Sequence, residues 1–180
     1  MRINIKLADK NSLDDAIKYL EKYRDDLLVK TKVFIDRLID IGIETAEFNT
    51  GEYKGYIVFR KNFKADKEGI TGVLVATDRQ KITRWWYKND KLVSADISPL
   101  LMAEFGSGWF ASVLDNVEGV GQGTFPGQTH AFDEDGWDWV DEDGVPHHSY
   151  GETPTFPMHS ASIAMLYEIN RIAQEVFGHG

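Results

Sequence analysis

Apolar residues recur at helical spacing over the first quarter of the chain, from Leu13 to Ile41. Ser12 precedes them with the character of an N-cap residue, and Gly42 follows them as a plausible stop. An unbroken helix of this length would span roughly 43 Å at 1.5 Å per residue. Because that is long for a small domain, the pattern leaves room for a break near Arg24–Asp26. We expect the apolar stripe to pack in the core.

Period-two alternation marks the strands. Ile3, Ile5 and Leu7 alternate with polar residues and predict a short first strand. Four later segments are rich in β-branched and aromatic residues and are separated by turn-like stretches. These segments are Tyr53–Arg60, Ile70–Asp78, Lys81–Lys88 and Lys91–Ile97. Since short connections make neighbouring strands antiparallel, the four predict a β-meander.

A second amphipathic pattern closes the chain. It covers His159–Phe177, with Pro157 near its start and Gly178 at its end, and it predicts a C-terminal helix. Between Gly106 and Thr155 the chain has little periodicity and is rich in Gly, Pro, Asp and aromatic residues. A loop of this length inside a compact domain indicates a working segment, and we expect a hairpin around Trp137–Pro146 within it.

Together these elements predict a single α+β domain of 180 residues. Its parts are an N-terminal strand and long helix over residues 1–44, and an antiparallel meander sheet over 52–105. A long aromatic and Gly-rich loop with a hairpin follows over 106–155. A C-terminal helix over 156–178 is expected to pack on the sheet.

Charge and composition narrow the classes of function. The net charge of −9 argues against non-specific binding to nucleic acid or to an anionic membrane. One local basic cluster is interpreted as the solvated side of a hairpin; it comprises Lys54, Arg60, Lys61, Lys64 and Lys67. The chain contains no Cys, which excludes disulfides and thiolate ligands and fits a reducing cytoplasm. It has no apolar run of about 20 residues and no signal-peptide pattern, so we expect a soluble protein that stays in the cell that makes it.

The segment Ala131–Ser160 concentrates acids, Trp and His, which raises the question of a metal or catalytic site. The EF-hand template fails, because aligning its Gly to Gly136 or Gly144 places Ala131 or Trp139 at the first ligand position. No pair of histidines has the i, i+4 spacing of a helical zinc site. The chain also lacks a G-x-S-x-G elbow and a phosphate-binding loop. We therefore predict no catalytic residues, no metal and no cofactor.

Two alternatives stay open. One is a small metal-dependent hydrolase that uses His147 or His148 with Asp135 or Asp141. The other is an acidic protein-binding module of the antitoxin or immunity type, which would bind one partner tightly. Against both stands the aromatic content of the loop, which is typical of binding anchors in a protein-contact surface.

The order of motifs resembles the tailed-bacteriophage neck and tail-completion family of the lambda minor tail protein Z type. The resemblance rests on "EFGSG" (Glu104–Gly108) after a strand-like segment, "GWDW" (Gly136–Trp139), "HSYG" with "TPTFPM" (His148–Met158), and the terminal helix. It covers residues 10–177 and is strongest from Leu101 to Phe177. The segment Phe48–Phe59 matches only in part the basic patch and "R-x-G-x-L" segment of the family. The hairpin Asp133–Asp143 also carries more acidic residues than is expected for the family.

The resemblance implies a structural virion protein that joins the tail to the head by ring assembly, not an enzyme. Its partners would be further copies of itself and neighbouring head-closure, tail-terminator or tail-tube proteins. DNA would pass through the lumen without specific binding. The protein would be found at the head–tail junction of the virion, and in the host cytoplasm during assembly. The residues we predict for assembly are Glu104, Phe105, Trp109, Trp137, Trp139, Tyr150, Phe156 and Met158. Among them, Phe105 and Met158 are expected to pack the loop onto the sheet, and Trp137 and Trp139 to reach a neighbour.

Overall fold

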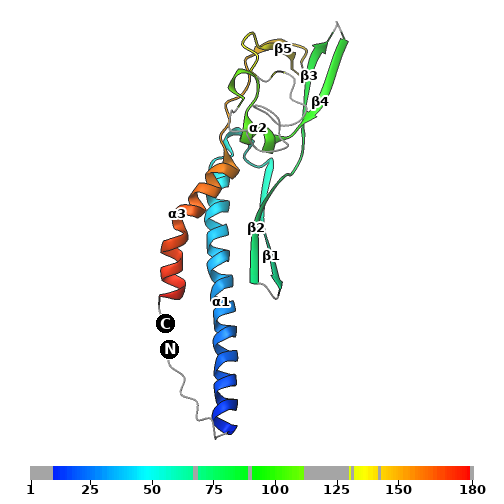
Figure 1. Ribbon diagram of the computed structural model, residues 1–180. Coiled ribbons are helices and arrows are strands. Elements are labelled where there is room, and N and C mark those ends of the chain that lie inside the picture. Colours follow the sequence, from blue (N-terminus) through cyan, green and yellow to red (C-terminus); the bar gives the residue numbers. More distant parts are fainter. Residues whose placement is uncertain are drawn as a thin grey trace.

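The computed structural model describes residues 10–66, 69–88, 91–111, 130, 132–141 and 143–178. These residues form an α+β fold with a long stem and a smaller head (Figure 1). Helices α1 and α3 and the strands β1 and β2 form the stem, and helix α2 and the strands β3 to β6 form the head. The predicted strand around Ile3–Leu7 and part of the Gly-rich loop lie outside the described residues.

Helix α1 runs without interruption over Lys10–Phe48, a length of 39 residues. It includes Ser12 and Gly42, so the predicted N-cap and the predicted stop are both wrong, and no break occurs near Arg24–Asp26. Gly42 has a packing function instead. A Cβ atom there would lie 2.8 Å from Leu74 Cδ1 and 2.9 Å from Met165 Sδ. The missing side chain therefore lets a strand and a second helix approach α1 at one level.

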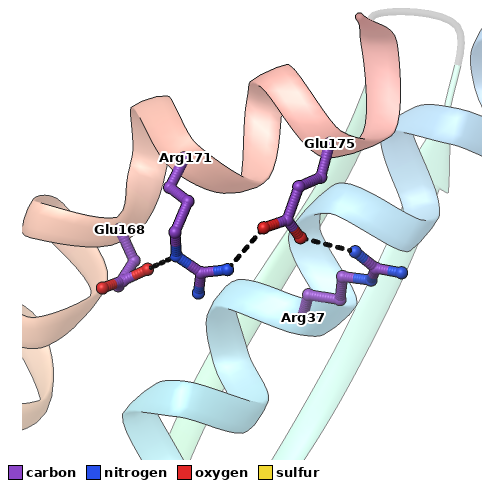
Figure 2. Close-up of polar contacts among 4 residues, drawn as sticks. All are labelled: Arg37, Glu168, Arg171 and Glu175. Carbon is purple, nitrogen blue, oxygen red and sulfur yellow. Dashed lines mark hydrogen bonds and ion pairs between the residues drawn. The ribbon is translucent and has the colours of Figure 1, made fainter. Parts of the chain in front are cut away.

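Helix α3, Pro157–Phe177, lies along the upper half of α1 and runs in the opposite direction (Figure 1). Figure 2 shows the polar edge of this seam, where Arg37 of α1 pairs with Glu175 of α3 (Nη1–Oε2 3.2 Å). Arg171 extends the chain of contacts to Glu175 (Nη1–Oε1 2.7 Å) and to Glu168. The C-terminal helix thus packs mainly on α1, which separates it from the sheet on which it was expected to lie.

Strands β1, Ile57–Asp66, and β2, Gly69–Asp78, form a two-stranded antiparallel sheet beside α1. Gly72 of β2 meets the helix so closely that a Cβ atom would lie 2.3 Å from Ile35 Cγ2. Lys61 of β1 adds ion pairs to Asp36 and Asp40 of α1 (2.6 and 2.8 Å). The hairpin is therefore part of the stem.

Strands β3, Ile82–Lys88, and β4, Lys91–Ile97, belong to a different, four-stranded sheet. Its order is β4-β3-β5-β6, where β5 is Trp137–Val140 and β6 is Pro146–Ser149. The hairpin expected around Trp137–Pro146 is confirmed, and it joins the sheet through the pairing of Trp85 with Val140. The predicted single meander divides between two sheets because the late hairpin, and not β2, occupies the free edge of β3.

The head and the stem meet at a small core under helix α2, Pro99–Phe105. The core contains Tyr53, Ile57, Met102 and Ala103. Tyr53 closes the short 3-10 helix η1, Gly51–Tyr53, which follows α1. The "EFGSG" motif begins in the last turn of α2, so it does not follow a strand directly, as was expected. Among the described residues no helix combines the length and the apolar character that a membrane span requires.

Candidate assembly surface

Glu104, the first predicted assembly residue, caps helix α3. Its carboxylate accepts hydrogen bonds from the main-chain N–H of Met158 (N–Oε2 2.7 Å) and of His159 (N–Oε1 2.9 Å). The first N–H groups of a helix lack partners within it, and a carboxylate also suits the positive end of the helix dipole. Phe156 at the N-cap position makes no side-chain cap, so Glu104 fills that place from a different helix.

Phe156 turns the chain into α3 with a left-handed backbone, at φ 54°. The turn is fixed by two hydrogen bonds, because the N–H groups of Thr155 and Phe156 both donate to the carbonyl of Ala103 (2.8 and 3.0 Å). Phe105 and Met158 are half-buried beside it. This part of the predicted site therefore joins α2 to α3.

The second part of the predicted site lies where three loop segments cross. The short 3-10 helix η2 spans Gly108–Phe110. The N–H of Trp109 donates to the carbonyl of Tyr150 (2.8 Å), and the N–H of Phe132 donates to the carbonyl of Gly108 (2.8 Å). Gly108 has φ 59°, and a Cβ atom there would lie 2.4 Å from the Tyr150 carbonyl oxygen, so only glycine permits this crossing.

The crossing holds four aromatic side chains at the surface. Their exposed fractions lie between 37% and 54%, and they are Trp109, Phe110, Phe132 and Tyr150. We call these four residues the aromatic patch. Main-chain hydrogen bonds at Trp109, Phe132 and Tyr150 hold the backbone of the crossing, so ordering this backbone on binding costs little conformational entropy. Exposed aromatic residues on a rigid frame are typical of protein-binding anchors.

The two Trp residues of β5 are less free than predicted. Trp137 stacks on His130 with ring centroids 4.7 Å apart. Trp139 lies between His147, at 4.6 Å, and the guanidinium carbon of Arg84, at 5.6 Å from its ring. Both are half-buried, so each offers a neighbour one edge of its ring and not the whole side chain.

Each of three loop histidines contacts a separate aspartate. The pairs are His130 with Asp133 at 3.2 Å, His147 with Asp141 at 2.8 Å, and His148 with Asp138 at 2.9 Å. The hydrogen bond from His147 and those from the main-chain N–H groups of Val145 and Asp143 hold the pKa of Asp141 below its usual range. In the part of the chain that the structure describes, no three His, Asp or Glu side chains converge as a metal site would require. Of the residues that the hydrolase alternative names, the structure thus brings together His147 and Asp141, at the turn between β5 and β6.

Glu152 links the crossing to the stem. Its carboxylate accepts a hydrogen bond from the Tyr53 hydroxyl and lies 3.5 Å from Arg84 Nη2. Burial, followed by the nearby charge of Glu52, raises the pKa of Glu152 to about 7. Head and stem are thus joined by a carboxyl group that titrates near neutral pH.

The structure therefore divides the eight predicted residues. Glu104, Phe105, Phe156 and Met158 lie at the α2–α3 junction, Trp109 and Tyr150 lie in the aromatic patch, and Trp137 and Trp139 lie on β5. The lower half of α1, whose apolar stripe was expected in the core, is exposed instead, as at Leu20 and Leu27. The signal that could have found it is the excess length of the helix over the size of the domain.

No protein-family model matches the chain, and neither a curated protein nor a solved structure matches it.

Proposed function

We propose that this protein is a structural virion subunit of a tailed phage or prophage that acts in head–tail joining or tail completion. The observation that carries the proposal is the aromatic patch, four exposed aromatic side chains on the head at a crossing of loop segments that main-chain hydrogen bonds hold together. Such a surface suits protein contact better than catalysis. The likeness of the "EFGSG", "GWDW" and "TPTFPM" motifs to the neck family supports the specific role.

The shape of the molecule also supports an assembly role. A stem with one long, partly uncovered helix and a head with a rigid aromatic surface provides two contact regions far apart in one chain. A subunit of a ring needs at least two such regions, since each copy must contact both neighbours. The same subunit must also contact the adjoining head or tail component.

The proposal is tested by joining heads and tails in vitro. Particles made without this protein are mixed with purified wild-type protein, or with the Trp109→Ala, Tyr150→Ala double variant, and infectious particles are counted. We expect the wild type to restore infectivity and the double variant to lose most of it. Phe48→Ala is the matched control, because Phe48 is 88% exposed but lies outside the aromatic patch. Wild-type protein that leaves infectivity unchanged and does not bind tails would refute the proposal.

A further inference from the structure

The lower half of α1 exposes large apolar side chains and has no neighbouring helix or strand among the residues that the structure describes. We define the lower stem as residues 10–29, and Figure 1 shows no other described helix or strand beside it. Eight of its large apolar side chains are between 42% and 65% exposed. They are Leu13, Ile17, Tyr19, Leu20, Tyr23, Leu27, Leu28 and Val29. Apolar residues exposed at this density mark a contact surface in a protein of ordinary composition.

The lower stem continues a seam that is already occupied higher up. Leu20, Leu27 and Phe34 follow one another at intervals of seven residues, or nearly two helical turns, so they lie on one side of α1. Phe34 contacts Phe177, the last residue of α3, with ring centroids 5.8 Å apart. The side of α1 that α3 covers above Phe34 is therefore exposed below it at Leu27 and Leu20, whereas Ala16, further down on the same side, is buried. A helix is the occupant that fits the exposed stretch.

Helix α3 carries a second open apolar face. Ala161 and Ile172 are buried, and Met165 closely approaches Gly42 of α1. On the opposite side Ile163, Leu166 and Tyr167 are 41%, 61% and 83% exposed. We call these three residues the outer α3 face. Asn170 continues it by one helical turn without adding a charge, although 27% of the residues in the chain are charged. Depletion of charge is a property of interface centres.

We propose that the lower stem of one copy packs against the outer α3 face of a second copy, in a head-to-tail arrangement. The outer α3 face covers residues 163–167 and, with Asn170, about two turns of α3, so it would meet part of the lower stem. Both present apolar side chains spaced three, four or seven residues apart, as helix packing requires.

A second copy is the occupant that uses both open faces. A symmetric contact between two lower stems would leave the outer α3 face exposed in every subunit. A head-to-tail contact buries one face of each kind per interface, and it repeats until the rotation between subunits closes a ring. The inference thus specifies one contact between subunits of the ring, besides any made by the head, and rests on the proposed function for its biological meaning.

The test is a mixing experiment with two variants. One variant carries Leu20→Glu and Leu27→Glu in the lower stem, and the other carries Leu166→Glu and Tyr167→Glu in the outer α3 face. Each is studied alone and mixed in equal amounts, by light scattering and sedimentation over a concentration series. Circular dichroism and melting curves first establish that each variant folds, as expected for side chains that are at least 42% exposed.

We expect the mass of the wild-type protein to rise with concentration and each variant alone to remain a monomer. The mixture should form a dimer and stop there, since only one intact face of each kind remains. Each double substitution should lower the association constant by on the order of 100-fold or more. The control is Lys18→Gln with Lys22→Gln, which makes the same change in net charge on the opposite side of α1 and should associate like the wild type.

Three results would overturn the inference. The first is a wild type that stays monomeric at every concentration, and the second is a mixture that stays monomeric. The third is an outer-face variant that dimerises alone, which would indicate a symmetric contact between lower stems. Head–tail joining that persists with either variant would overturn the inference but leave the proposed function standing. Self-association without any binding to tails would support the inferred contact between copies but contradict the proposed function.

Discussion

Phe34 of α1 and Phe177 of α3 lie with their ring centroids 5.8 Å apart, and this contact is the lower end of the seam between the two helices. Above it α1 has α3 along one side, and below it the same side of α1 is open. The pair therefore marks the boundary between the part of α1 that stabilises the monomer and the part that is available to a neighbour.

The Phe34→Ala variant should lose about 2 kcal/mol of unfolding free energy, less than a fully buried Phe would lose, because the ring is only partly covered. Leu20→Ala, below the boundary, should change the stability of a dilute monomer by less than about 0.5 kcal/mol. Urea denaturation at low protein concentration measures both values. Equal losses at the two sites would show that the lower stem is covered within one chain.

Glu104→Ala should destabilise the protein by about 1–2 kcal/mol, since two main-chain N–H groups at the start of α3 lose their acceptor. Glu104→Gln keeps one acceptor oxygen and should lose less. The measurement is the shift in the urea midpoint at constant slope. If both variants unfold like the wild type while infectivity falls, Glu104 acts at an interface and not as a cap.

The two packing glycines should respond differently to alanine. In Gly72→Ala the new methyl group meets Ile35 Cγ2, which is attached close to the helix backbone, so we expect a loss of about 2 kcal/mol. In Gly42→Ala the methyl group meets the flexible ends of Leu74 and Met165. A gain of about 1 kcal/mol in helix propensity then offsets much of the strain. Melting temperatures should therefore rank the wild type close to Gly42→Ala and well above Gly72→Ala.

Stability should fall as the pH rises through neutrality because of Glu152. Its folded pKa of about 7 lies above the ordinary value of 4.5, so the folded state holds a proton that the unfolded state has already released. The contribution is fully present below about pH 4.5 and is lost as the pH passes 7, with an upper limit of about 3 kcal/mol. Glu152→Gln should remove this part of the pH dependence.

Melting curves at pH 5 and pH 8 test this prediction. The Gln variant should gain most over the wild type at pH 8, and the exposed carboxylate of Glu44 on α1 supplies the control Glu44→Gln. A gain of the same size at both pH values would mean that the ionisation of Glu152 is not the cause.

The Trp139→Ala variant should leave the monomer folded and block ring formation. Its ring stacks between His147 and Arg84, so its loss costs contacts at the surface of the head and none in the core around Met102. His147→Ala is the matched control, because it removes the stacking partner and keeps the Trp. Circular dichroism and light scattering give the two readouts, and a collapsed fold would assign Trp139 to the core.

The sequence predicted where helices and strands lie along the chain better than it predicted which of them pack together. Pro157 and Gly178 bound α3 as expected, and the hairpin at Trp137 lies where the turn residues placed it. These features follow from backbone preferences that act over a few residues. Gly42 was misjudged because glycine serves equally as a helix stop and as a point of close contact, and only the positions of Leu74 and Met165 distinguish the two.

The sequence indicated which aromatic and acidic residues to examine, but not which of them lie together in the structure. Trp109 and Tyr150 are exposed at the surface, where an anchor residue must lie. Glu104 instead accepts hydrogen bonds from the start of α3, more than fifty positions away in the chain. The stripe of Leu20 and Leu27 has the same spacing as a buried stripe, because periodicity reports which side of a helix is apolar and not what covers it.

Because α1 is unbroken, its length sets the distance between the two ends of the molecule. Its 39 residues fix the separation between the head and the tip of the stem at about 58 Å, because no hinge interrupts the helix. In a straight helix, each added residue changes both the length and the direction in which the apolar side points. Seven residues added to the lower stem would lengthen it by about 10 Å and nearly keep the direction of its apolar side, whereas two residues would turn that side away. The distance between the two ends of this molecule is thus set by a number of helical turns.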